Sequence, residues 1–92
     1  MIVRIIGEGQ LDVPAEHLHE LNELDTSLAK AVAQGNEPLF AQDLARLLDR
    51  VRELGTPLPH EQLSVSDFIL PSTDASLSDV QALLGDDGLI PG

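Results

Sequence analysis

Apolar residues near the start of the chain follow the two-residue period of a β-strand. The segment "IVRII" is β-branched apart from Arg4, and "LDV" a little further on alternates between apolar and polar residues. Gly7 and Gly9 separate the two segments, and glycine tolerates the positive φ angles of a tight turn. The pattern predicts a β-hairpin with strands at residues 2–7 and 9–13.

After Pro14 the apolar spacing changes to the three and four residues of an amphipathic helix. One such segment extends from Ala15 to about Gln34, and a second from about Glu37 to Leu54. The short "GN" link predicts that the two helices are antiparallel neighbours. Seven apolar side chains on their facing stripes are predicted to be buried: Leu21, Leu24, Leu28, Leu44, Leu47, Leu48 and Val51.

The other face of the second helix carries charges of alternating sign, which predicts exposed ion pairs between residues three or four apart. These residues are Asp43, Arg46, Asp49, Arg50, Arg52 and Glu53.

Proline and serine recur throughout the last third of the chain. A short third strand is predicted within residues 64–70, with Val65, Phe68 and Leu70 as buried contributors, and no other strand is expected outside residues 2–13. Ser76 and Asp79 have the spacing of a capping box, which predicts a short helix that ends near Leu84. The expected fold is α+β, with an N-terminal hairpin, a long antiparallel helix pair and a looped C-terminal region.

The final segment "GLIPG" contains Leu89 and Ile90 between glycine and proline. These two side chains either pack back on the core or contact a partner. Together with Phe68, Ile69 and Leu70 they are the candidate partner-binding residues.

Composition and charge narrow the function. The chain has 92 residues, which fits a single domain over residues 1–92. Sixteen acidic and five basic side chains give a net charge of −11, and no lysine or arginine follows Arg52. Such a surface repels nucleic acid and anionic lipid, and it fits either a basic partner or simple solubility. With no apolar stretch of membrane-spanning length and no signal-peptide pattern, a cytoplasmic protein without membrane insertion is expected.

Few residues form patterns typical of catalysis or of cofactor or metal binding. The Gly7-Glu8-Gly9 turn lacks a third glycine at position 12 and is followed by a strand pattern, so a nucleotide-binding loop is not favoured. His17 and His19 are two residues apart and point in different directions on a helix, so they are expected to be surface neighbours of nearby carboxylates, His19 with Glu23. There is no cysteine, and the serines have no nucleophile context. We assign no catalytic, cofactor-binding or metal-binding residue, and an enzyme is not expected.

Five segments together resemble the PspA-associated protein family (PspAA). They are "MIVRIIGEGQ" at the start, "LNELD" at 21–25, "GTPLP" at 55–59, "SDFILPSTDASLSDVQALL" at 66–84 and the final "GLIPG". The resemblance implies an accessory protein or regulator of PspA-type proteins, which are coiled-coil membrane-remodelling proteins of the envelope stress response. The family has no catalytic motif, so the resemblance implies no active-site residue.

Two functional hypotheses follow. The first is a non-enzymatic protein–protein interaction module, with a PspA-type protein as partner and self-association as a further possibility. The alternative is a small-molecule or metal-binding sensor in the same pathway, which would use the acidic face or His17 and His19.

Overall fold

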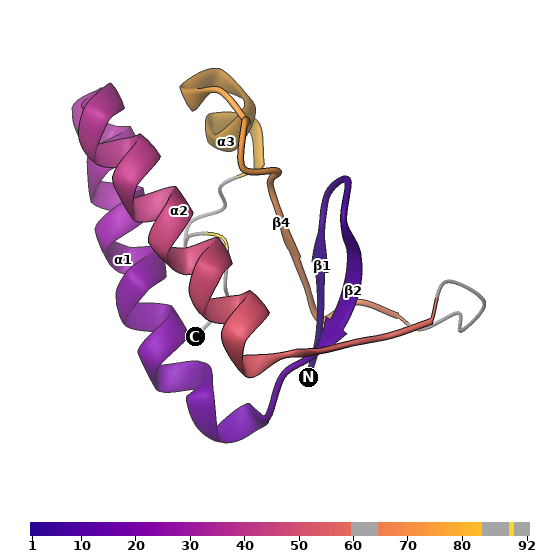
Figure 1. Cartoon of the computed structure of the whole chain (residues 1–92). Coiled ribbons are helices and arrows are strands. Elements are labelled where there is room, and N and C mark those ends of the chain that lie inside the picture. The colour runs from indigo at the N-terminus through magenta and orange to yellow at the C-terminus, as the bar shows by residue number, and fades with distance from the viewer. Residues whose placement is uncertain (60–64, 84–88, 90–92) are drawn as a thin grey trace.

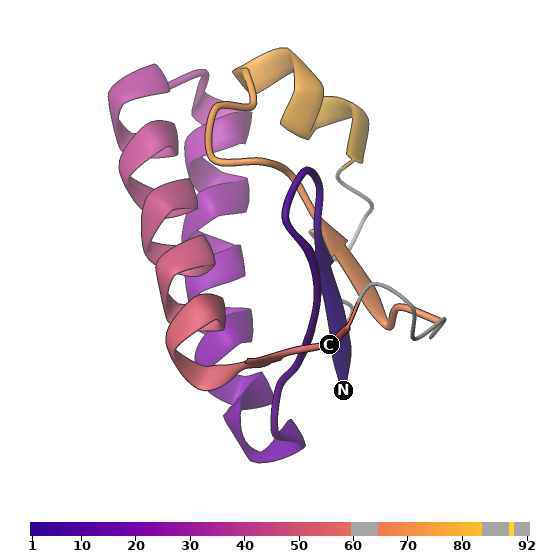
Figure 2. The same cartoon turned by 45° about the vertical axis from the view of Figure 1, so that its right-hand side comes forward.

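The computed structural model describes residues 1–59, 65–83 and 89. A sheet and an antiparallel pair of long helices form two layers, and a short helix lies beyond one end of the strands (Figure 1, Figure 2). The α+β class predicted from the sequence is confirmed, with its hairpin, helix pair, later strand and short C-terminal helix.

The N-terminal hairpin pairs β1 (Ile2–Ile5) with β2 (Gly9–Asp12) in antiparallel register. Gly7 and Gly9 have φ angles of 88° and 111°, so the predicted use of glycine in the turn is confirmed. Residues that follow the Gly7 turn continue as a strand and not as a helix, which is the arrangement of a hairpin turn and not of a dinucleotide loop.

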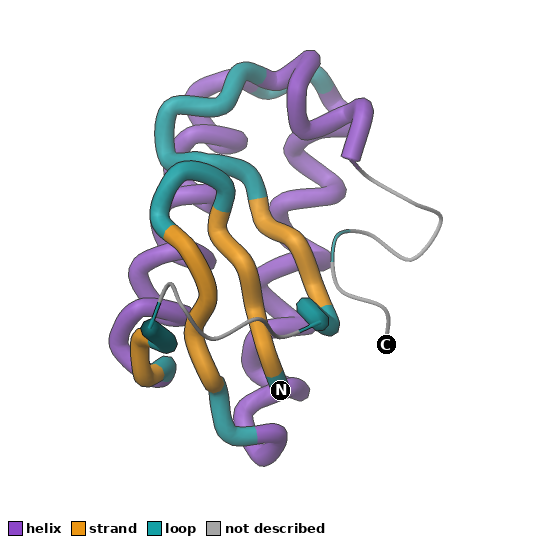
Figure 3. Tube along the Cα trace, turned by 90° about the vertical axis from the view of Figure 1, so that its right-hand side faces the viewer, coloured by secondary structure: helices purple, strands orange, loops and turns teal. Residues whose placement is uncertain are grey.

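Two further strands extend the sheet on either side, in the order β3-β2-β1-β4 (Figure 3). The strand β4 (Phe68–Leu70) lies parallel to β1, within the predicted residues 64–70 but shorter. The strand β3 (Thr56–Pro57) pairs antiparallel with β2. The prediction that strands are confined to residues 2–13 and 64–70 is therefore wrong at β3, because pairing with β2, and not local sequence, makes this dipeptide a strand.

The helical layer consists of α1 (Leu18–Gln34) and α2 (Glu37–Leu54). Gly35 ends α1 in the left-handed conformation at φ 65°, and the Asn36 side chain accepts a hydrogen bond from the Leu39 N–H at 3.2 Å to begin α2. The predicted start of the first helix at Ala15 is corrected, because the residues after Pro14 form a separate 3₁₀ turn, η1 (Ala15–His17).

The core lies between the sheet and the helix pair and is almost entirely aliphatic. Leu21, Leu28, Leu47, Leu48 and Val51 are fully buried, and Leu44 is nearly so, as predicted. Other buried members include Val3, Ile5, Leu11 and Leu70 from the sheet, Val13 directly after β2, and Val80 from α3 (Leu77–Leu83).

Several side chains differ from expectation, and one of them is Phe68, which was predicted to be buried and is only partly buried. Leu24 is only partly buried, at the edge between the two helices. Val65 is 90% exposed, because β4 does not begin until Phe68. Asp43, predicted on the exposed charged face, is buried and accepts a hydrogen bond from the Ser27 hydroxyl at 2.9 Å. Asp25 is also buried, and its carboxylate accepts a hydrogen bond from the Leu89 N–H at 3.0 Å.

Candidate interaction surface

The sheet face opposite the helix pair carries exposed apolar side chains. Along β1, Val3 and Ile5 point into the core, so Arg4 and Ile6 point to the opposite face. Ile69 pairs with Arg4 in the parallel register and is half exposed on that same face. The outer face therefore presents two isoleucines and an arginine close to one end of the strands.

At this end of the sheet, α3 lies beside the strands. The predicted capping box fixes its start, because the Ser76 hydroxyl accepts a hydrogen bond from the Asp79 N–H and the Asp79 carboxylate accepts one from the Ser76 N–H, both at 3.1 Å. Val80 is fully buried, and its packing on the core fixes the rotation of α3. Asp79, Ala82 and Leu83, spaced three and four residues apart, then share one face of the helix, and this face lines an open groove.

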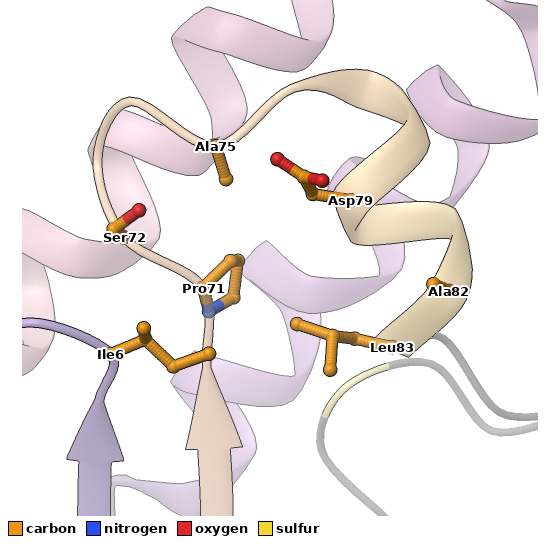
Figure 4. Close-up of a pocket in the computed structure, with 7 residues that line it drawn as sticks. All are labelled: Ile6, Pro71, Ser72, Ala75, Asp79, Ala82 and Leu83. Carbon is orange, nitrogen blue, oxygen red and sulfur yellow. The ribbon is translucent and has the colours of Figure 1, made fainter.

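This groove, which we call the α3 groove, has a volume of about 310 Å³. Figure 4 shows Ile6 and Leu83 extending toward Pro71 from opposite sides, with the Asp79 carboxylate and Ser72 at the border. Five of its seven lining residues are apolar: Ile6, Pro71, Ala75, Ala82 and Leu83, with Ser72 and Asp79 completing the lining.

Arg52 on α2 holds together the two loops that bound the α3 groove. Its guanidinium donates hydrogen bonds to both carboxylate oxygens of Glu8, which lies in the hairpin turn beside Ile6. It also donates to the Thr73 hydroxyl at 2.7 Å and to the Asp49 carboxylate at 2.8 Å. The hairpin turn and the loop before α3 are therefore fixed to the same helix, and the groove is formed before any partner arrives.

The charged contacts have the expected effect on ionisation. Hydrogen bonds from the Arg52 guanidinium are the main cause that lowers the pKa of Glu8, although partial desolvation opposes them. Glu20 on α1 accepts two hydrogen bonds from Arg50 on α2, and these lower the pKa of Glu20 in the same way. Both carboxylates are thus held in their charged form at neutral pH.

The five predicted partner-binding residues occupy different environments. Ile69 is 50% exposed, and Phe68 is partly buried against the core. Leu70 and Leu89 are buried in the core, and Ile90 lies outside the described residues. Contact of these residues with a partner stays a prediction, and Ile69 is the described member whose side chain is most open to one.

Sequence reasoning missed Ile6 and Leu83 as surface residues. The strand pattern at residues 2–7 includes Ile6, and its even position, shared with Arg4, is the signal for the outer face. Leu83 is 41% exposed at the end of α3, and its spacing from Asp79 placed both on one helical face. What the sequence did not contain was the position of α3 beside the strands.

The histidines lie apart from this groove. His19 contacts Glu23 at 3.1 Å, as predicted, whereas His17 in η1 contacts Glu16 at 3.7 Å. Within the part of the chain that the structure describes, no three histidine, aspartate or glutamate side chains are grouped so as to hold a metal ion.

The fold and this surface define a small α+β domain with a preformed apolar groove on an acidic molecule. A family model described as PspA-Associated protein (PspAA) matches residues 1–92, the whole chain, and the chain therefore belongs to this family. The family is an accessory family and not a family of enzymes. No curated protein and no solved structure is significantly similar to the chain.

The family name associates the chain with PspA. Among the described residues, none of the helices has both the length and the apolar character needed to cross a membrane.

Proposed function

We propose that this chain is a non-enzymatic binding module that associates with a PspA-type protein and regulates its action in the phage-shock response to membrane stress. The match of the PspAA family model to the whole chain carries this proposal. The module would act in the cytoplasm, on a partner of the coiled-coil type.

Two features of the molecule support a role in protein contact. Exposed large apolar side chains gather at the α3 groove, and such patches are typical of protein–protein contact sites. The net charge of −11 favours a partner with basic segments, because complementary charge accelerates association and orients the two molecules.

Titration calorimetry with the purified PspA-type protein of the same organism tests the proposal. We expect saturable binding that weakens several-fold between low and high salt without vanishing, because salt screens exposed charges while apolar contacts persist. An unrelated coiled-coil protein of similar length and charge serves as the control. If the full chain does not bind the PspA-type protein at any salt concentration, the proposed function is wrong.

A further inference from the structure

Three of the five exposed large apolar side chains among the described residues lie around one feature. Ile6 and Leu83, which are 45% and 41% exposed, line the α3 groove. Ile69 is 50% exposed on the same sheet face as Ile6, because it pairs with Arg4 and strand side chains alternate. Leu39 on α2 and Val65 do not line the groove.

Acidic side chains lie at one end of this surface, and a basic side chain lies at the other end. Asp79 borders the groove, and the exposed Asp74 lies in the loop between Ser72 and α3. No lysine or arginine follows Arg52 in the sequence, and the Arg52 guanidinium, which reaches Thr73 beside Asp74, is already paired with Glu8 and Asp49. At the other end Arg4 is exposed beside Ile69, and no carboxylate among the described residues forms an ion pair with its side chain.

We propose that the α3 groove together with Ile69 is the docking surface for one amphipathic helix of the partner. The apolar stripe of this helix packs on Ile6, Ile69 and Leu83. Its lysine or arginine residues lie toward Asp74 and Asp79, and a carboxylate lies toward Arg4. The proposal rests on the proposed function, since it names the surface and the partner chemistry for that association.

The shape and lining of the groove favour a helix over a small ligand. Small-molecule sites are concave and bring several polar groups toward the ligand. Here the groove is open, and one of its two polar lining residues, Asp79, already accepts the Ser76 N–H. A helix that presents side chains at i, i+3, i+4 and i+7 matches an open apolar groove with a charged border. A second copy of this chain is disfavoured because each copy carries a charge of −11.

The test compares matched substitutions in the full chain, with binding to the PspA-type protein measured by calorimetry. Leu83→Asn and Ile69→Asn should each weaken binding about tenfold or more, the effect of removing a central apolar anchor. Leu39→Asn makes the same chemical change at a similarly exposed leucine on α2, and it should change the affinity less than about twofold. Thermal melting of each variant confirms that the fold is intact.

Charge reversal tests the orientation of the helix. Asp74→Lys should weaken binding at low salt and reduce the salt dependence, whereas Glu23→Lys, the same reversal on α1, should leave both unchanged. If the wild-type chain binds but Leu83→Asn and Ile69→Asn behave like Leu39→Asn, this surface is wrong while the proposed function stands. If sedimentation shows a wild-type dimer that Leu83→Asn converts to a monomer, the occupant is a second copy, and the proposed partner helix is wrong.

Discussion

Gly55 occupies a position where any side chain must displace core atoms. It follows α2 and donates its N–H to the Val51 carbonyl at 2.8 Å, with an ordinary φ of −90°. A Cβ atom at this position would lie 2.9 Å from the Leu11 Cβ, 2.9 Å from the Val51 carbonyl oxygen and 3.2 Å from Val13 Cγ2. Close approach of β2 to the end of α2, and not an unusual backbone angle, therefore requires glycine here.

Two opposing effects determine how much Gly55→Ala changes the free energy of unfolding. The reduced freedom of the unfolded chain favours alanine by about 0.4–1 kcal/mol. Overpacking of a close-packed core costs about 1–3 kcal/mol. Because the two closest atoms belong to the backbone of α2 and to a Cβ fixed on β2, a change of rotamer cannot relieve the contact. The overpacking cost should therefore lie in the upper part of its range, about 2–3 kcal/mol, and we expect a net loss of about 1–2.5 kcal/mol in the free energy of unfolding.

Thermal unfolding followed by circular dichroism measures this loss. For a domain of this size, 1 kcal/mol corresponds to about 4–8 °C, so the melting temperature should fall by roughly 4–20 °C. The amide resonances of Leu11 and Val13 should also shift in a two-dimensional NMR spectrum. A melting temperature equal to or above that of the wild type would refute the close approach of β2 to the end of α2.

Three other measurements test separate parts of the structure. Leu47→Ala should cost about 2–5 kcal/mol because the side chain is fully buried, while Leu39→Ala on the same helix should cost much less, as denaturant unfolding will show. Asn36→Ala should destabilise the protein by about 1 kcal/mol in the same assay, because the cap on the Leu39 N–H is lost. Since Arg52 lowers the pKa of Glu8, the ionised carboxylate stabilises the fold above about pH 4.3, and this contribution is lost as the pH falls through the lowered pKa. The melting temperature of the wild type should therefore exceed that of Glu8→Gln near neutral pH, and the difference should disappear at a pH below the lowered pKa of Glu8. Equal melting temperatures of the two proteins near neutral pH would contradict the ion pair.

The helix pair could be predicted from the sequence because the residues that define each helix and its ends are close together in the chain. Leucines recur at helical spacing, and Gly35-Asn36 contains both the end of one helix and the start of the next. The capping box at Ser76 was predictable for the same reason, since both of its hydrogen bonds join residues three positions apart.

Long-range features had no such local signal. Asp25 and Asp43 look like surface carboxylates on a helical pattern, and their burial involves partners distant in the chain, such as the Leu89 N–H for Asp25 and the Ser27 hydroxyl for Asp43. The dipeptide at β3 becomes a strand only beside β2. The α3 groove likewise has no local sequence signal, because it depends on where the loop after β4 positions α3.

The parallel pairing of β1 with β4 also sets the order in which the protein matures during synthesis. The Asp67 carboxylate binds the Ile2 N–H across 65 positions of the chain, whereas the hairpin and the helix pair join near neighbours. On the ribosome, the hairpin and both long helices can form while β4 is still inside the exit tunnel. Pro71 and α3 reach the Ile6 side chain only after β4 has paired. A partner that docks in the groove would therefore recognise molecules in which β4 has paired with β1 and would pass over those in which it has not.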